Sequence, residues 1–398
     1  MVVAAPACAL VLVFADRLGS ALTGGLPDIA GATAASALAW LVPAGFGQLV
    51  AAITASALAA RDSYVAAAVA FAAGAVCALL VFVLLADRHG PLALAWGGAA
   101  NSAVALAIAL GALVFGLWPA RPRRALAPFR RVARILDIAA LPLAVQALYV
   151  IALRLAAGGG VGDVTNLSYA YIFAAAGVAA TASSLALVSS APLTRRGLDS
   201  GAAATHIVHA TWLSLIVVAA AAALFALVGG GIVHTVLGDA FGGEAGRELG
   251  RLIVALTPWM IASVALAVTF PLLFVFERGT LLLPLAAAAI GFDVAVSLVL
   301  REAFGLEGVA VALGLSTFVV VAALLASVSG RLLRSAAVGL APPTLAVGIL
   351  TVATFGTAGL FLPSAAAAAV GFALYALVLI TVRPRALREA WAYVRTLH

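Results

Sequence analysis

Long apolar stretches separated by short polar segments run through the whole chain. Twelve of them have about the length of a membrane-spanning helix: 2–20, 30–59, 64–86, 91–118, 135–157, 166–191, 205–237, 250–275, 280–300, 306–329, 337–361 and 365–382. About 20 apolar residues cross the hydrocarbon core of a bilayer as a helix, and a helix satisfies its own backbone hydrogen bonds in lipid. The pattern predicts an all-α polytopic membrane protein with about 12 transmembrane helices.

The composition agrees with this class and narrows the partners. Of the 398 residues, 65% are hydrophobic and 9% are charged, and the mean hydropathy is +1.21. Soluble domains carry about 25% charged residues. The net charge is +7 and all 22 basic residues are arginine. In a membrane protein this excess marks loops that face anionic lipid, so we expect membrane lipids and no nucleic acid as partners.

The arginines also predict the orientation of the helices. If the N-terminus lies in the cytoplasm, most arginines fall on cytoplasmic segments, and only Arg88, Arg247, Arg251 and Arg301 fall outside. Positive residues concentrate on the cytoplasmic side of membrane proteins. The chain is therefore expected to be a multi-pass protein of the cytoplasmic membrane, with both termini in the cytoplasm.

A repeat relates the two halves of the chain. The stretch "GPLALAWGGAANSAVALAIAL" (90–110) matches "GLEGVAVALGLSTFVVVAALL" (305–325), and the polar pair at 101–102 aligns with the pair at 316–317. The separation of about 215 residues spans six predicted helices, so both copies have the same orientation. This is the signature of two parallel-repeat lobes related by an axis near the membrane normal.

The repeat predicts four segments along the chain. These are an incomplete N-lobe of four helices (1–120), a basic cytoplasmic linker (121–134), a C-lobe of six helices (135–330), and two extra helices with a basic cytoplasmic tail (331–398). The first four helices match only the last four helices of the C-lobe. The N-lobe is therefore expected to lack its first two helices.

One stretch carries a resemblance to a known family. "LPLAVQALYVIALRLAAGGGVGDVTNLSYAYIFAAAGVAATASSLALVSSAPLTRR" (141–196) contains Pro142, a glycine-rich exit at 158–162, the motif "LSYAY" at 167–171, and Pro192 shortly before two arginines. It resembles helices seven and eight of the polysaccharide and lipid II flippases, the MurJ/MviN-like and Wzx-like branch of the MOP exporter superfamily. The stretch 253–325 also resembles that superfamily's later helices, and 42–110 resembles the superfamily more weakly, so the resemblance covers roughly residues 40–330.

The resemblance implies a fold and a function. Members of that branch usually have fourteen helices, as two parallel six-helix lobes plus two, which agrees with a chain that lacks two helices. It implies a flippase that moves a lipid-linked oligosaccharide or cell-wall precursor, such as a polyprenyl-linked glycan, by alternating access between two lobes. Lipid II flippases typically carry arginine three residues after the tyrosine of "YA", where this chain has Ile172. A generic lipid-linked glycan therefore fits better than lipid II.

Polar residues inside the predicted helices are the candidates for a substrate pathway, because intramembrane charge is costly and marks function. Arg154 shares a helical face with Gln146 by spacing, and a guanidinium suits a sugar-phosphate or pyrophosphate. The alternative for Arg154 is a side chain that extends to the lipid head groups. Asn101, Tyr169 and Tyr171 complete the proposed pathway.

Two acidic residues are candidates for coupling transport to an ion. Asp293 lies deeper in a predicted helix than any other acid, and Asp137 lies near the start of the helix that carries Arg154. The alternative for Asp137 is a favourable interaction with the helix dipole. His206 and His209 have a spacing that metals can use, but without nearby cysteines or acids no metal is expected.

The polar stretch "GDVTNLSYAYIF" (162–173) leads into one of the predicted helices. Asp163, Thr165 and Asn166 are expected to form an outer loop and the N-cap of that helix. Tyr169 and Tyr171 follow in the first two turns, two residues apart and pointing in nearly opposite directions. We expect one of them to face lipid and the other a cavity.

Other functions remain open at this stage. The sequence contains no GxxxxGK[ST] motif, and we expect neither a cofactor nor an enzymatic activity. A cation-coupled multidrug antiporter is one alternative, and an inactive truncated paralogue acting as a partner subunit is another. A membrane glycosyltransferase is a third, but it would usually bring a large outer loop, whereas the segment around 238–250 is short.

Overall fold

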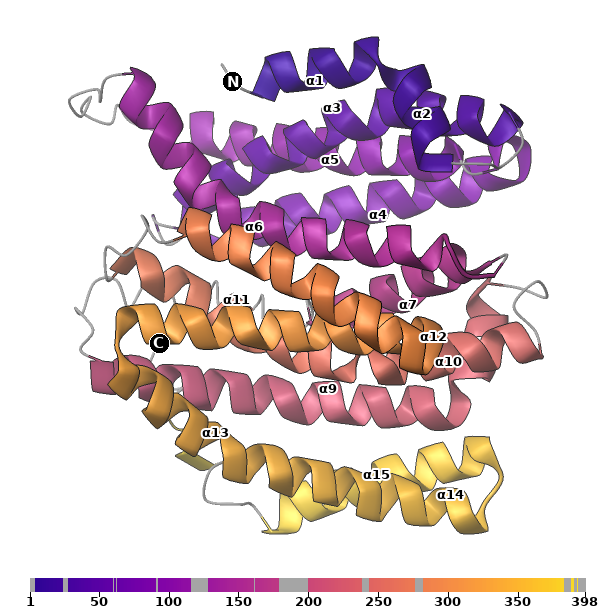
Figure 1. Cartoon of the computed structure of the whole chain (residues 1–398), viewed down its shortest axis with the longest axis vertical. Coiled ribbons are helices and arrows are strands. Elements are labelled where there is room, and N and C mark those ends of the chain that lie inside the picture. The colour runs from indigo at the N-terminus through magenta and orange to yellow at the C-terminus, as the bar shows by residue number, and fades with distance from the viewer. Residues whose placement is uncertain are drawn as a thin grey trace. The chain divides into compact units, whose positions relative to one another are not determined.

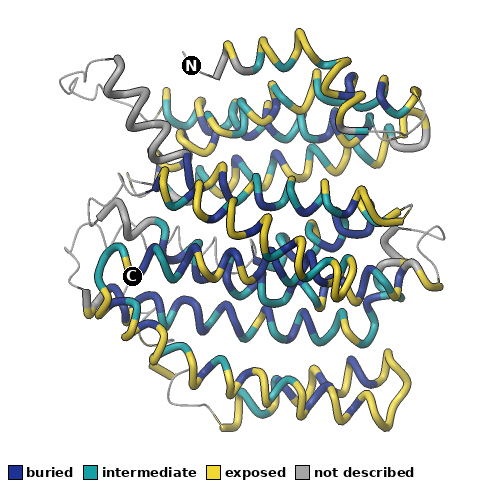
Figure 2. The backbone as a smooth tube through the Cα atoms, in the orientation of Figure 1, coloured by how far each residue is buried: buried dark blue, intermediate teal, exposed yellow. Residues whose placement is uncertain are grey.

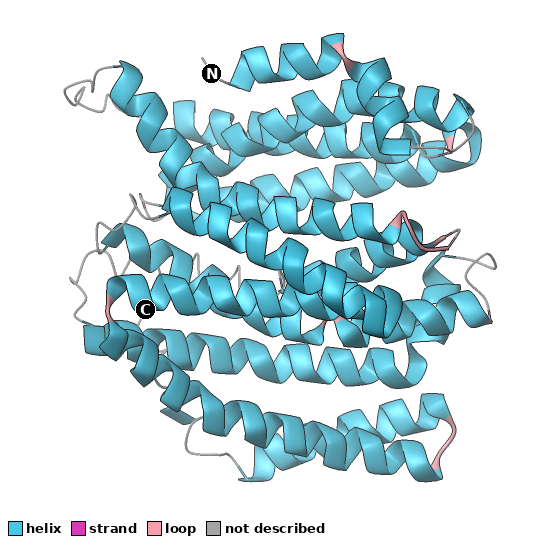
Figure 3. Ribbon diagram, viewed as in Figure 1, coloured by secondary structure: helices cyan, strands magenta, loops and turns pink. Residues whose placement is uncertain are grey.

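In a computed structural model, the structure describes residues 4–23, 28–59, 61, 63–90, 92–115, 128–160, 162–178, 200–237, 243–275, 282–382, 388–389 and 392. Within this part of the chain the regular elements are helices, with no strand (Figure 3). The chain divides into two compact units, Met1–Pro128 and Phe129–His398. This division falls inside the basic segment that the sequence assigned to a linker, while the finer domain boundaries stay a prediction.

The first unit is a bundle of helices. It contains α1 (Ala4–Val13), α2 (Ala15–Thr23), α3 (Asp28–Ala59), α4 (Tyr64–His89) and α5 (Leu92–Phe115). Helix α5 packs along both α3 and α4. Small residues allow these close contacts: the α4 carbonyl oxygen of Ala78 would lie 2.9 Å from a Cβ added at Gly97 of α5. Close approach at small residues is the usual way in which membrane helices associate.

The second unit is larger and has the deeper core. Its helices are α6 (Pro128–Ala156), α7 (Asp163–Val178), α9 (Ser200–Leu237), α10 (Glu244–Ala255), α11 (Thr257–Val275), α12 (Leu282–Val328), α13 (Gly330–Thr351), a π-helical turn (Val352–Gly356), α14 (Thr357–Phe361) and α15 (Ser364–Val382). Buried positions concentrate on α9, α11 and α12 of this unit (Figures 1 and 2). A core cluster joins α6, α7, α10, α11 and α12 through residues such as Leu148, Leu167, Leu252 and Leu313.

Two of the long helical segments are broken, each for a visible reason. Helix α12 is 47 residues long, but Gly305 within it has φ 59° and ψ −136°. The chain therefore folds back there as a hairpin of two helices, which matches the predicted spans 280–300 and 306–329. Helices α10 and α11 meet at Leu256 with a bend of 45°. Pro258 follows the break, and it cannot donate a backbone hydrogen bond to the preceding turn.

The twelve predicted stretches all have helical counterparts in the described residues. By length and apolar composition alone, the described part contains seven candidate membrane spans, or eight if the bent pair α10–α11 is one span. The α12 hairpin counts as one of these spans. Two segments are too short to be counted, namely the apolar part of α6 (Ala140–Ala156) and the sixteen described residues of α7. The second half of the predicted stretch 166–191 lies outside the described residues.

The start of α6 differs from the expectation. The sequence placed a linker at 121–134 and a helix from 135, whereas α6 begins at Pro128. Proline is favourable in the first turn of a helix because the missing N–H has no partner there anyway. The residues before Pro128, from 116 onwards, lie outside the described part. The basic segment therefore contributes its last arginines to a helix.

The C-terminal helices pack on α9. Ser329 caps α13 by accepting a hydrogen bond of 3.0 Å from the Leu332 N–H. The Tyr375 hydroxyl on α15 donates to the Ile216 carbonyl oxygen on α9 at 2.9 Å. Aromatic contact between Phe355 and Tyr375 and the glycine at 371 bring the π-helical turn against α15.

Candidate functional site

The exposed face of α6 carries the polar residues that the sequence selected. Leu141, Ala144, Leu148 and Ala152 are buried on one side of this helix. Gln146, Val150 and Arg154 are exposed on the other side, so the shared face predicted from their spacing is present in the structure. The side chain of Asp137, near the start of the same helix, lies outside the described residues.

Aromatic side chains connect α6 to its neighbours. The Tyr149 and Tyr171 rings stack with centroids 3.9 Å apart and an interplanar angle of 18°. Tyr171 also contacts Trp259 of α11, with centroids 4.5 Å apart. Such pairs contribute about 0.5–1.5 kcal/mol beyond their burial. This stack fixes the relative position of α6, α7 and α11 behind the exposed polar face.

The two tyrosines were expected to point in different directions, one to lipid and the other to a cavity. Tyr169 and Tyr171 are both half-buried, and both pack against the same core cluster, so the structure does not separate them by burial. Which of them faces lipid stays a prediction. Helix α7 contacts α9, α10, α11 and α12. Among its described side chains, Val164, Thr165 and Ile172 are exposed.

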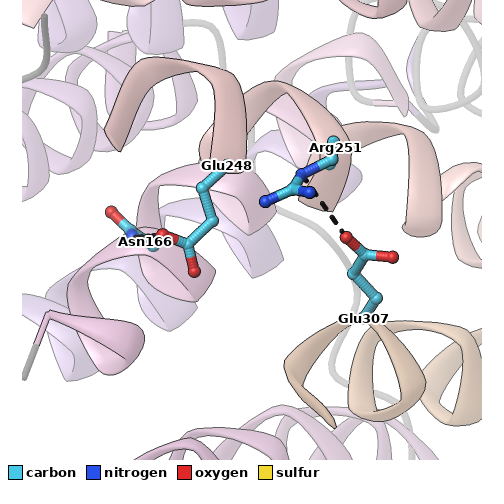
Figure 4. A network of polar contacts seen from close by, with 4 residues as sticks. All are labelled: Asn166, Glu248, Arg251 and Glu307. Atoms are coloured by element: carbon cyan, nitrogen blue, oxygen red, sulfur yellow. Dashed lines mark hydrogen bonds and ion pairs between the residues drawn. The ribbon is translucent and has the colours of Figure 1, made fainter. Parts of the chain in front are cut away.

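The expected cap of α7 is also different. Asn166 is buried one turn inside α7, and its Nδ2 donates to Glu248 Oε2 of α10 at 3.2 Å (Figure 4). Asp163 begins the helix and accepts a hydrogen bond of 2.7 Å from the Gly160 N–H, in the preceding turn. Asp163 therefore orders the glycine-rich turn, while Asn166 ties α7 to α10.

Asn101 lies in the first unit at the contact of α5 with α4. Its Oδ1 atom is buried and has no hydrogen-bond partner of normal geometry among the described residues. It lies so close to Gly74 that a Cβ at that glycine would overlap it. The neighbouring Ser102 hydroxyl donates to the Ala44 carbonyl oxygen of α3 at 2.6 Å. The polar pair therefore lies between helices of the first unit.

Asp293 is fully buried inside the α12 hairpin, at 0% exposure. Ser316, on the other half of the hairpin, lies near the carboxylate. Neither oxygen of Asp293 has a partner of normal hydrogen-bond geometry, and the hydroxyls of Ser297 and Ser316 are also unpartnered. An unsatisfied carboxylate is costly inside a membrane protein, so this cluster is the best candidate for ion coupling.

A polar network links the start of α7, helix α10 and the tip of the α12 hairpin. The sequence did not predict it. Arg251 Nε of α10 lies 3.6 Å from Glu307 Oε1 of α12, and Glu248 on α10 reaches Asn166 on the opposite side (Figure 4). Glu248 and Arg251 are three residues apart and point to different neighbours. The signal that could have found them was the alternation of acidic and basic residues in "EAGRELGR" (244–251), which predicts a separate amphipathic helix.

A cavity of about 1360 Å³ lies beside this network. It is lined by the end of α9, by α10, by the tip of the α12 hairpin and by the start of α15. His234, Glu244, Arg247, Arg251 and Glu307 provide its charged or titratable side chains. Within the described residues, no group of three or more histidine, cysteine, aspartate or glutamate side chains is arranged to hold a metal ion.

Comparison with known proteins finds similarity at the level of structure. No family model and no curated protein sequence matches the chain. The structure is similar to a solved structure of "Lipid II flippase MurJ, inward closed conformation", with a TM-score of 0.64 and 13% sequence identity. The similarity covers 96% of this chain and 81% of that chain. At this identity the likeness shows a shared all-helical fold and no more.

Proposed function

We propose that the chain is a flippase that moves a lipid-linked oligosaccharide or cell-wall precursor across the cytoplasmic membrane. The observation that carries the proposal is the fold shared with a lipid II flippase over 96% of the chain. The parallel repeat of the sequence supports the same proposal, because such repeats are typical of transporters that work by alternating access. Both termini are proposed to lie in the cytoplasm.

The exposed face of α6 is the proposed contact for the head group. A sugar-phosphate needs a cation and hydrogen-bond donors, and Arg154 and Gln146 supply them two turns apart. The stacked rings of Tyr149 and Tyr171 join α6 to α7. Asn101 is proposed to act on the same pathway from the first unit. Asp293 and Asp137 are the proposed groups for coupling to an ion.

Transport in proteoliposomes tests the proposal. The purified chain is reconstituted with a fluorescent lipid-linked oligosaccharide, and the fraction accessible to an external quencher is followed over time. We expect faster translocation than in protein-free vesicles, and a loss of at least about tenfold in Arg154→Ala, because a charge-assisted hydrogen bond to phosphate is lost. The control is Arg88→Ala, which removes an exposed arginine at the end of α4.

Two results would contradict the proposal. Equal rates with and without the folded protein would exclude a flippase acting on this substrate. Equal rates for Arg154→Ala and Arg88→Ala would remove Arg154 from the pathway. Export of a fluorescent cationic drug without any movement of the oligosaccharide would favour a multidrug antiporter instead.

A further inference from the structure

The cavity beside α10 has apolar walls below a charged opening. Phe225 of α9, Val254 of α10, and Leu300, Phe304 and Val311 of α12 provide apolar lining. The charged residues lie near the start of α10 and the tip of the α12 hairpin, where the chain turns at the end of the bundle. The same end of the bundle holds the end of α9 and the start of α10 (Figure 1). A space lined by apolar side chains and, at the end of the bundle, by charged ones fits an amphiphile.

Glycines shape this space. A Cβ added at Gly229 of α9 would lie 3.2 Å from the Gly250 Cα of α10, and one at Gly230 would lie 3.3 Å from the Gly246 carbonyl carbon. The backbones of α9 and α10 are therefore in contact, and they form part of the cavity wall. Gly231 differs, since a Cβ there would meet no atom within 4 Å. Its missing side chain leaves part of the cavity open.

The charges at the opening are balanced. Arg251 and Glu307 face one another at 3.6 Å. The other two charged lining residues, Arg247 and Glu244, are both exposed and have no ion-pair partner among the described residues. Both lie in the first turn of α10, where Gly243 offers no side chain to cap the helix. The free N–H groups and positive dipole end of such a turn favour a phosphate.

We infer that this cavity binds a zwitterionic glycerophospholipid with a primary ammonium in its head group. The phosphate would lie between Arg247 and the first N–H groups of α10, the ammonium would contact Glu244, and an acyl chain would follow Phe225, Val254 and Val311. A purely anionic lipid would leave Glu244 without a counter-ion, and a neutral diacylglycerol would leave Arg247 without one. The site is separate from the exposed face of α6 and does not depend on the transported substrate.

Lipid titration of the purified full chain in detergent tests this site. Binding of phosphatidylethanolamine, phosphatidylglycerol and diacylglycerol is measured by native mass spectrometry and by the lipid-dependent rise in Tm. We expect phosphatidylethanolamine to bind most tightly. Arg247→Gln and Glu244→Gln should each weaken it about tenfold, because each removes one charged contact to the head group. Gly231→Leu should weaken phosphatidylethanolamine and phosphatidylglycerol equally by filling the space for the chain.

The matched control is Arg88→Gln, which makes the same charge change at an exposed arginine of the first unit. It should leave phosphatidylethanolamine binding unchanged. Equal binding by Arg247→Gln and Arg88→Gln would overturn the site. Tighter binding of phosphatidylglycerol than of phosphatidylethanolamine, unaffected by Glu244→Gln, would overturn the assignment to a zwitterionic lipid. Equal binding of diacylglycerol would show that no phosphate is recognised.

Discussion

The α4–α5 pair of the first unit and the two halves of α12 in the second unit are the hairpins that the sequence repeat pairs with one another, and they bury different side chains. Between α4 and α5, Gly74 faces Asn101, and the packing relies on small residues and one neutral amide. Inside α12, Asp293 lies opposite Ser316 with both of its oxygens lacking normal hydrogen bonds. A buried amide is common in helix packing, whereas an intramembrane carboxylate is costly and is retained where it has a task. The two hairpins therefore differ in the polar group that they bury, a neutral amide in the first unit and a carboxylate in the second.

The largest expected effect concerns the tight turn of the second hairpin. A Cβ at Gly308 would overlap the Leu300 carbonyl oxygen across the hairpin, and backbone cannot move aside as a side chain can. Gly308→Ala should lower the free energy of unfolding by about 3 kcal/mol, at the upper end of overpacking costs. The measurement is denaturant unfolding in detergent, with Gly291→Ala as control. Gly291 lies in the same helix and has nothing within 4 Å of an added Cβ. Equal stability of the two variants would mean that the two halves of α12 do not pack as closely at Gly308 and Leu300 as the structure shows.

The second expected effect is a difference between Asp293→Asn and Asn101→Ala, measured by transport and by Tm. Asp293→Asn should reduce proteoliposome transport at least about tenfold without lowering Tm, because the amide keeps the shape and removes a costly charge. Asn101→Ala should lower Tm, because it removes an interhelical contact next to Gly74. If Asn101→Ala also abolishes transport while the protein stays folded, both hairpins belong to the pathway. Unchanged transport in Asp293→Asn would exclude ion coupling through this carboxylate.

The smallest effect compares two hydroxyls at matching positions of the repeat. Ser102 donates across to the Ala44 carbonyl oxygen, while Thr317 donates to Leu313 in its own helix at 2.7 Å. Ser102→Ala should cost about 0.6 kcal/mol, the average for an interhelical hydrogen bond in a membrane protein. Thr317→Val should cost less, since no bond between helices is lost. Thermal unfolding of both variants in the same detergent checks the difference, and a larger loss in Thr317→Val would reverse the comparison.

The sequence predicted the helices well because membrane thickness sets their length. The expected stretches 30–59 and 365–382 differ from α3 and α15 by at most two residues at either end. The break at Gly305 was also predicted, since charged residues and a glycine interrupt the apolar pattern there. The burial of Asp293 followed from its central place in a predicted helix. These features depend on local composition, which a sequence displays directly.

The contacts between helices were not predictable in the same way. Asn166 was expected to cap its own helix, but its partner Glu248 lies 82 residues further along the chain. The segment before 250 was treated as a loop, so the amphipathic helix α10 and the cavity beside it were missed. Tyr169 and Tyr171 were placed by helical angle alone, but both pack against one core cluster formed with neighbouring helices. Such partners depend on tertiary packing, which one sequence without relatives does not show.

The turn at Gly305 also bears on how the protein is made. Because Gly305 is the residue of α12 with non-helical dihedral angles, the two halves of α12 are not separated by a loop that would let one half enter the bilayer before the other. They would partition into lipid together, as a preassembled hairpin released sideways from the insertion machinery. Asp293 would then meet Ser316 before it meets lipid, so an unfavourable residue crosses the membrane already shielded by its own neighbouring helix. The glycine would thus act during biogenesis, before any substrate is present.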